Sequence, residues 1–167
     1  MKTSFWSLGI STIVSLVALS SLNLQRHNFQ VRLLAQEFEE SEDNFEYWAQ
    51  SCSESNNPNQ AIAACDRALT FDNIDARFLA LTWYNRAVML GSLGRFTEAI
   101  ESYNEVIKFN PDRADLMSRT WYNNGIMFMQ LGRYQEAVFA FEQALEIFPD
   151  FDLARQKRNS ALIQLRN

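Results

Sequence analysis

The chain has 167 residues, of which 47% are hydrophobic and 13% aromatic, and this composition excludes an intrinsically disordered protein. Residues 1–35 contain no acid and three of the 15 basic residues (Lys2, Arg26 and Arg32), so the rest carries 12 basic and 20 acidic residues. Because phosphate groups need a basic surface, this acidic body argues against nucleic acid as a partner.

The first segment combines a basic start with a long apolar run. Lys2 precedes an uncharged stretch from Phe5 to Leu24, which is typical of a secretory signal and is also long enough to span a bilayer. We therefore predict that residues 1–35 form a signal peptide or an N-terminal membrane anchor. Cleavage after Ser20, with Ala18 two residues earlier, fits the small-residue rule better but falls early, and cleavage after Ala35 fits it at one position only. The alternative is a buried N-terminal helix.

An acidic segment follows, with six acids in ten residues: Glu37, Glu39, Glu40, Glu42, Asp43 and Glu46. Charge runs of this kind are usually solvated. Residues 36–44 are therefore predicted to be an acidic linker or a first helical turn, and a charged docking face is the alternative.

Two later stretches align with each other at one fixed interval, which we call the repeat spacing. Trp83, Gly94, Ala99 and Pro111 in one correspond to Trp121, Gly132, Ala137 and Pro149 in the other. The same spacing, applied backwards, relates Ala99 to Ala61 and Trp83 to Phe45, so a degenerate first unit precedes the two regular ones. Internal repeats of this length indicate a stack of small helical units.

The pattern resembles the tetratricopeptide repeat family. Five kinds of position match: an aromatic and a small residue in the first helix, a glycine in the turn, an alanine in the second helix and a closing proline. In unit two these are, in that order, Trp83, Ala87, Gly94, Ala99 and Pro111. In unit three they are Trp121, Gly125, Gly132, Ala137 and Pro149. The resemblance implies an all-α solenoid of three antiparallel helical hairpins over residues 45–151, with units at about 42–75, 80–113 and 118–151.

The repeat spacing, which is 38 residues from Trp83 to Trp121, is longer than the usual unit of about 34 residues. The excess corresponds to roughly one helical turn, and we place it at Ala76–Leu79 and Ala114–Met117, so that the first helices of units two and three begin early. After the last unit, residues 152–167 carry a narrow apolar stripe on a polar background and are predicted to form a C-terminal capping helix.

The two cysteines, Cys52 and Cys65, fall in unit one on different helices. In the repeat register they correspond to the interior positions of Leu90 with Tyr103. In an exported protein we expect them to form a disulfide that holds the weakest hairpin together. The alternative is two buried thiols, and two thiols without a third ligand are too few for a metal site.

The sequence offers no catalytic group to the repeats. The only histidine is His27, so Ser–His and Cys–His arrangements are excluded from residues 36–167. There is no phosphate-binding loop or Gly-rich nucleotide fingerprint. We therefore predict a protein that is not an enzyme and needs neither a cofactor nor a metal.

The family resemblance implies that the first helices line a concave groove that holds a peptide. The matching positions are Leu81, Tyr84, Asn85, Val88, Arg119, Tyr122, Asn123, Ile126, Met129 and Gln130. Chaperone-binding members of the family clamp a terminal carboxylate with Lys and Arg. Here Glu46 stands at one of those positions and only Arg119 is a cation, which argues against that ligand class.

The predicted function is therefore a scaffold that binds a peptide or protein partner, on the extracytoplasmic side of a membrane that it touches only through its N-terminal segment. The alternatives are a self-associating structural protein, which would be a homo-oligomer, an assembly factor for a photosynthetic membrane complex, and an exported enzyme. The missing catalytic groups count against the last of these.

Overall fold

The computed structural model describes residues 26, 29–30, 32, 44–109 and 112–166. The chain divides into two units, Met1–Asn44 and Phe45–Asn167. Among the described residues, no helix is both long enough and apolar enough to cross a membrane. The apolar run of the predicted leader and most of the acidic segment lie outside the described residues.

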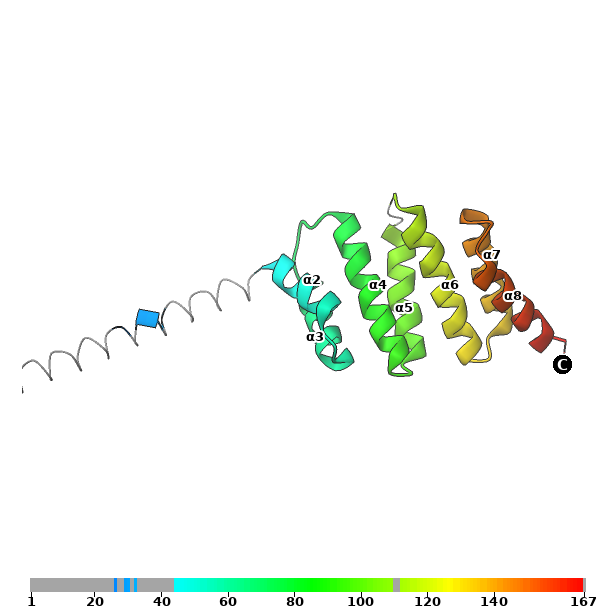
Figure 1. The fold of residues 1–167 in the computed structure, drawn as a ribbon, viewed down its shortest axis with the longest axis horizontal. Helices are drawn as coiled ribbons and strands as arrows, with labels where there is room; N and C mark the ends of the chain where they lie inside the picture. Colours follow the sequence, from blue (N-terminus) through cyan, green and yellow to red (C-terminus); the bar gives the residue numbers. More distant parts are fainter. Residues whose placement is uncertain (1–25, 27–28, 31, 33–43, 110–111, 167) are drawn as a thin grey trace, which may run out of the picture. The chain divides into compact units, whose positions relative to one another are not determined.

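In its described residues the second unit consists of seven helices and has no strand (Figure 1). Consecutive helices pair as hairpins, α2 with α3, α4 with α5 and α6 with α7, and α8 packs on α7. This confirms the predicted all-α stack of helical hairpins with a final helix. The helices are α2 (Phe45–Glu54), α3 (Pro58–Ala68), α4 (Ala76–Ser92), α5 (Phe96–Phe109), α6 (Ala114–Gln130), α7 (Tyr134–Ile147) and α8 (Asp152–Gln164).

Residues with left-handed backbone conformation follow helices in all three hairpins. Gly94 and Gly132, which follow α4 and α6, have φ angles of 74° and 70°, a region that glycine enters without steric cost. The amide of Arg95 donates to the carbonyl of Leu90, so a carbonyl that α4 leaves open is satisfied. Asn73, where the first unit lacks its closing proline, has a φ of 60°, which asparagine tolerates better than most residues.

The two regular units have longer first helices than unit one. Helices α4 and α6 begin at Ala76 and Ala114 and contain 17 residues each, whereas α2 contains 10. The extra turns therefore lie at the starts of α4 and α6, as the repeat spacing predicts. Asp75 caps α4, because its carboxylate accepts a hydrogen bond from the amide of Arg77 at 2.8 Å.

The first helices of neighbouring units approach one another, and the second helices do not. Contacts join α2 to α4, α4 to α6 and α6 to α8, but within the described residues none join α3 to α5 or α5 to α7. The stack therefore curves with α2, α4, α6 and α8 on its inner side. We call the surface of these four helices the groove.

Helix α8, the predicted capping helix, also follows the repeat spacing. It begins at Asp152, one repeat spacing after Ala114 at the start of α6, just as α6 begins one repeat spacing after Ala76 at the start of α4. It therefore occupies the place that the first helix of a fourth unit would take. Ile163 occupies the position of Ala87 and Gly125, and it is 57% exposed because no second helix within the described residues covers it.

A disulfide joins the two helices of unit one, as the sequence predicts. Cys52 of α2 and Cys65 of α3 are both fully buried, with their Cα atoms 4.8 Å apart. In unit two the equivalent interior positions hold the larger side chains of Leu90 and Tyr103. The covalent bond thus takes the place of a large apolar contact.

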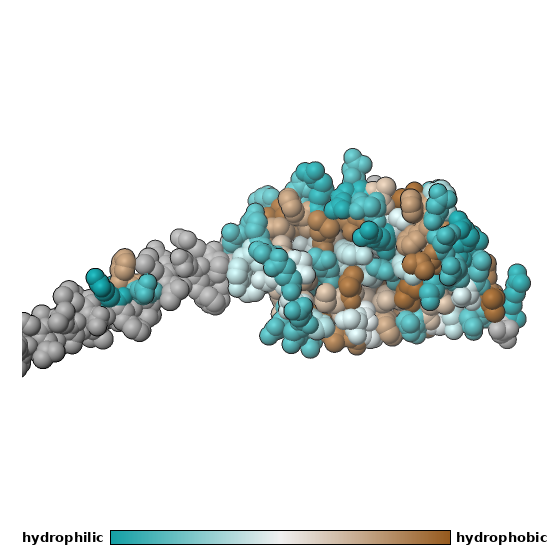
Figure 2. Space-filling model, viewed as in Figure 1, coloured by the Kyte–Doolittle hydropathy of each residue, from teal (hydrophilic) through white to brown (hydrophobic). Residues whose placement is uncertain are grey.

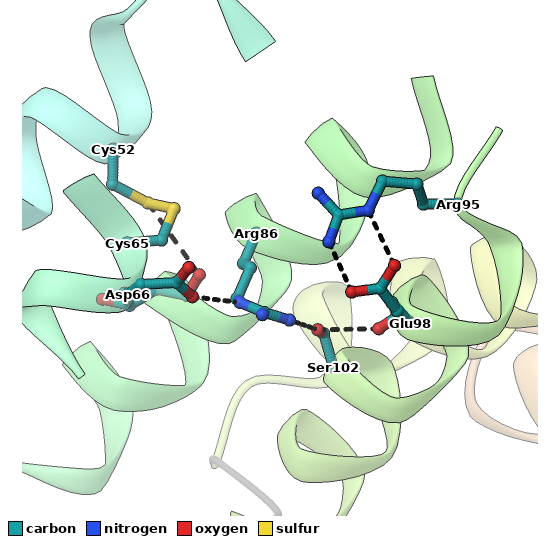
Figure 3. A network of polar contacts seen from close by, with 8 residues as sticks. Cys52, Cys65, Asp66, Arg86, Arg95, Glu98 and Ser102 are labelled. Carbon is teal, nitrogen blue, oxygen red and sulfur yellow. Dashed lines mark hydrogen bonds and ion pairs between the residues drawn. A yellow bond between two sulfur atoms is a disulfide. The ribbon is translucent and has the colours of Figure 1, made fainter. Parts of the chain in front are cut away.

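Polar bridges connect neighbouring units at equivalent positions. Figure 3 shows Arg86 of α4 between two partners: its Nε donates to the Asp66 carboxylate of α3 at 2.6 Å and its Nη1 to the Ser102 hydroxyl of α5 at 2.7 Å. One unit later, Asn124 of α6 donates to the Asn104 side chain of α5 at 3.2 Å. The charged bridge is thus replaced by an amide bridge. The buried Oδ1 of Asn124 has no hydrogen-bond partner in this part of the chain.

Two helical glycines allow close approaches of different kinds. A Cβ added at Gly125 of α6 would lie 2.7 to 2.9 Å from ring atoms of Phe141, whose side chain is fully buried on α7. A Cβ at Gly91 of α4 would lie 3.0 Å from the sulfur of Met127 on α6. The Phe141 ring is rigid and enclosed, whereas the Met127 sulfur lies near the end of a flexible side chain.

We expect Gly125→Ala to lower the free energy of unfolding by roughly 1–3 kcal/mol, because the ring has no room to move. Gly91→Ala is the matched control. Met127 can shift and alanine favours the helix by about 1 kcal/mol over glycine, so this variant should be neutral or more stable. Guanidinium denaturation followed by circular dichroism compares them. Equal losses in both variants would show that the Phe141 contact does not limit residue size at Gly125.

Candidate partner-binding groove

The centre of the groove is a contact between two residues predicted to line it. The Nδ2 of Asn123 on α6 donates a hydrogen bond to the hydroxyl of Tyr84 on α4 at 3.0 Å. The Tyr84 ring also packs edge-on against the buried ring of Tyr103, with their centroids 5.9 Å apart. This bond crosses between two units, so it fixes the spacing of two first helices.

The second groove tyrosine is held by aromatic packing. Tyr122 of α6 lies against Phe141 of α7, with centroids 5.8 Å apart, and against Phe151 just before α8, with centroids 4.8 Å apart. Phe151 itself meets Phe148 edge-on at 6.3 Å. A row of three rings therefore runs from the groove to the turn between α7 and α8.

The other predicted groove residues divide into two groups. The apolar ones are partly buried and pack against the hydrophobic clusters of the hairpins: Leu81, Val88, Ile126 and Met129. The polar ones make no hydrogen bond or ion pair with any described residue: Asn85, Arg119 and Gln130. Which of the ten residues contact a partner stays a prediction, but only the second group has side-chain polar groups that are entirely available.

A cleft opens at the C-terminal end of the groove, with a volume of about 470 Å³. One wall comes from α6 and the other from the end of α7 and the turn that follows it. Its lining residues are Ala114, Asp115, Ser118, Arg119, Ile147, Phe148 and Phe151. This volume falls within the range of roughly 300–1,000 Å³ that is typical of ligand pockets. The cleft therefore has room for one or two side chains of a partner.

Sequence reasoning includes Arg119 in the groove but misses the cleft beside it. Phe148 and Phe151 flank Pro149 and Asp150, in a turn that the repeat pattern treats only as a helix stop. The repeat spacing, extended once more from Ala114, would have identified α8 as a further groove helix. The lining residues of the cleft all precede α8, so this extension indicates the neighbourhood of the cleft without defining it.

Apolar and polar surface are unevenly distributed along the stack. On the face drawn in Figure 2, hydrophobic residues gather over α4 to α7, while the surface over α2 and α3 is mostly hydrophilic or neutral. Within the described ranges, no group of three or more His, Cys, Asp or Glu residues is arranged to hold a metal ion. The contacts on offer to a partner are thus aromatic, aliphatic, amide and guanidinium groups.

Tyr84 in the groove and Tyr103 beneath it have raised pKa values. Burial raises the pKa of Tyr84, and the hydrogen bond from Asn123 and the charge of Arg119 partly oppose this shift. Burial raises the pKa of Tyr103 further, and neighbouring Tyr84 adds to the effect. Both hydroxyls therefore stay neutral at pH values at which an exposed tyrosine begins to ionise.

Comparisons with known proteins agree with this geometry. A family model described as the tetratricopeptide repeat matches residues 80–113 and 118–151. No curated protein sequence matches the chain. The stack of hairpins with an inner layer of first helices therefore defines the class of protein, a helical-repeat solenoid. Residues 80–113 and 118–151 are therefore tetratricopeptide repeats, which supports the resemblance seen in the sequence.

Solved structures share the fold at low identity. The N-terminal domain of stress-induced protein-1 from C. elegans has a TM-score of 0.60 at 16% identity, over 71% of this chain and 95% of that one. A structure of MamA protein has a TM-score of 0.61 at 19% identity, over 87% and 84%. The first repeat domain of Spaghetti (RPAP3), bound to the HSP90 peptide SRMEEVD, has a TM-score of 0.56 at 19% identity, over 66% and 81%.

The shifted tyrosines predict how stability depends on pH. Their folded-state pKa values lie above the unfolded value of about 10, so their contribution is complete below that value and is lost as pH rises toward the folded-state values. We expect Tyr103→Phe to flatten this alkaline decline. Tyr47→Phe, which changes an exposed side chain, should not. Chemical denaturation at a series of alkaline pH values measures the slope, and identical slopes in both variants would contradict the assignment to Tyr103.

Proposed function

We propose that this protein is an interaction scaffold that binds a segment of a partner protein in the groove formed by α2, α4, α6 and α8. The observation that carries the proposal is the combination of packed rings and unused polar groups on one surface. Tyr84 and Tyr122 are held in place by neighbouring side chains, while Asn85, Arg119 and Gln130 keep their donors and acceptors available.

An extended peptide matches these groups chemically. Its backbone offers one donor and one acceptor for each residue, and the amides of Asn85 and Gln130 can bond to both. Tyrosine rings supply contact area at low cost in conformational entropy. Because the rings are already packed, binding would require little further ordering. The Spaghetti structure contains a bound HSP90 peptide, which supports a peptide ligand by analogy of fold alone.

The groove itself can be tested with side chains that reach solvent. Asn85→Glu with Gln130→Glu adds two charges to the groove and should abolish capture of the partner. The double variant Tyr84→Ala with Tyr122→Ala is less suitable, because those rings also stabilise the fold.

The matched control is Thr97→Glu with Gln135→Glu. These residues are exposed, lie at equivalent positions of α5 and α7, and carry the same added charge away from the groove. Affinity capture and mass spectrometry would compare the three proteins, with circular dichroism to verify folding. A partner that the groove variant captures as well as the control and the unmodified protein do would overturn the proposed function. The mass of the isolated protein in solution would separate partner binding from self-association.

We further propose that the repeats lie outside the cytoplasm. Two features support this location, namely the leader-like residues 1–35 and the disulfide between Cys52 and Cys65. Disulfides persist in oxidising compartments and are rare in the cytoplasm.

The oxidation state in living cells tests this location. Cells are quenched with acid and their proteins are alkylated in denaturant, with and without prior reduction; no cysteine should be labelled until the reductant is added. Cys52→Ser with Cys65→Ser is the unlabelled control. Two thiols that react without reductant in denatured extracts would contradict the proposal.

A further inference from the structure

At the junction of units one and two, an arginine packs against an aromatic ring. The guanidinium carbon of Arg86 lies 5.5 Å from the centre of the Trp83 ring, and its nitrogens donate to Asp66 and Ser102 (Figure 3). A cation over a tryptophan ring is attracted by the ring electrons, and a carboxylate beside it adds to the attraction. This junction therefore contains a cation site that an arginine of the same chain already fills.

The equivalent site at the junction of units two and three has the ring but no cation. Trp121 takes the place of Trp83, whereas Asn124 takes the place of Arg86. The cation–π contacts of the described residues do not include Trp121. The Asn124 side chain is only 1% exposed, and its acceptor atom Oδ1 has no hydrogen-bond partner in the described part of the chain. An arginine at this position would supply donors, and the asparagine leaves an acceptor unused.

A second ring enlarges this aromatic site on the surface of α7. Phe139 meets Trp121 edge-on, with the ring centroids 5.8 Å apart, and the Phe139 side chain is 55% exposed. Its equivalents in units one and two are Ala63 and Glu101, so the exposed ring is specific to unit three. Trp121 is itself partly exposed. Two adjoining rings are therefore accessible to a ligand.

The surroundings of the two rings are acidic. Helices α5 and α7 together carry six glutamates and one lysine. Glu142, one turn after Phe139, is exposed and forms no ion pair with a described residue. The cations on and around these helices are bonded within the chain or lie at a groove position: Arg95 with Glu98, Lys108 with Glu105, Arg133 with Glu136, Arg155 with Asp152, Arg158 with Asn159, and Lys157 at the groove position equivalent to Arg119. A positively charged ligand is therefore attracted to this surface.

We propose that Trp121, Phe139 and Glu142 form a binding site for an arginine side chain of a partner protein. The guanidinium lies over the aromatic pair, as Arg86 lies over Trp83, and its N–H groups donate to the Glu142 carboxylate. Arginine is preferred to lysine because its planar group stacks on rings and bonds to a carboxylate through two parallel hydrogen bonds. Phe139 and Glu142 belong to α7, outside the groove, so this site goes beyond the proposed function and does not depend on it.

The experiment titrates a peptide of alternating arginine and glycine, with blocked ends, into the purified full-length chain. The indole N–H resonances are followed by NMR and assigned with Trp83→Phe and Trp121→Phe. We expect the Trp121 resonance to shift and the Trp83 resonance to stay, because Arg86 already occupies the Trp83 ring. The matching lysine peptide should bind more weakly, the matching glutamate peptide should not bind, and salt should weaken the arginine peptide.

Two substitutions of exposed residues test the site directly. Phe139→Leu keeps the apolar bulk but removes the ring, and should weaken binding of the arginine peptide roughly two- to fivefold. Glu142→Gln should weaken it by a similar factor. The matched controls are Phe78→Leu, which removes a ring of 56% exposure from α4, and Glu101→Gln, which removes an exposed carboxylate from α5 at the position equivalent to Phe139. Both should leave the affinity nearly unchanged.

The site can also be filled from within the chain. Asn104→Asp with Asn124→Arg rebuilds the Asp66–Arg86 bridge at this junction and should abolish binding of the peptide, with circular dichroism to verify folding.

Three results would overturn the inference. Binding that is unchanged in Phe139→Leu would exclude the rings. Equal shifts of both tryptophans, or equal losses in Glu101→Gln and Glu142→Gln, would reduce the effect to general charge attraction. A mass in solution that falls from dimer to monomer in Phe139→Leu would make a second copy of the chain the occupant in place of a separate partner.

Discussion

Each hairpin depends on small residues where its two helices come closest. Ala87 and Ala99 are fully buried in one cluster, and Gly125 faces the Phe141 ring at a distance that excludes even a methyl group. Because protein interiors are close-packed, this contact fixes how far apart the helices lie. The separation of the helices in turn sets the angle at which the next unit can stack. The curvature of the groove follows from that angle.

The contacts between units differ along the stack. Arg86 joins units one and two through Asp66, and the Asn124–Asn104 amide pair takes over between units two and three. The Asp66 carboxylate is 53% exposed, so solvent weakens its attraction for Arg86, and we regard the bridge mainly as a device that sets orientation. Unit one, which lacks large side chains at two interior positions, is held by its disulfide. For a closed loop of this length the bond contributes about 3 kcal/mol.

Much of this architecture follows from the sequence because a repeat reports the same physical requirement several times. Gly94 and Gly132 both require a left-handed turn, and the spacing of Cys52 and Cys65 places both at interior positions. The site is harder to predict. Tyr84 and Asn123 occupy different positions of their units, so no repeat pattern relates them, and their bond depends on how two units stack. Phe151 covers Tyr122 from a turn whose conformation the repeat does not specify.

The packing of the groove also constrains what kind of partner it can hold. Its central rings are anchored from below by Tyr103 and Phe141, both almost fully buried, so the surface cannot rearrange without opening the core. A ligand must therefore fit the groove as it stands, and its affinity depends on the groups that remain adjustable. Those groups lie at the edges: amides on α4 and α6, cations on α6 and α8, and the exposed ring beside the cleft. Because the centre of the groove is rigid and its polar edges are adjustable, the groove favours a partner segment whose side chains complement those edge groups.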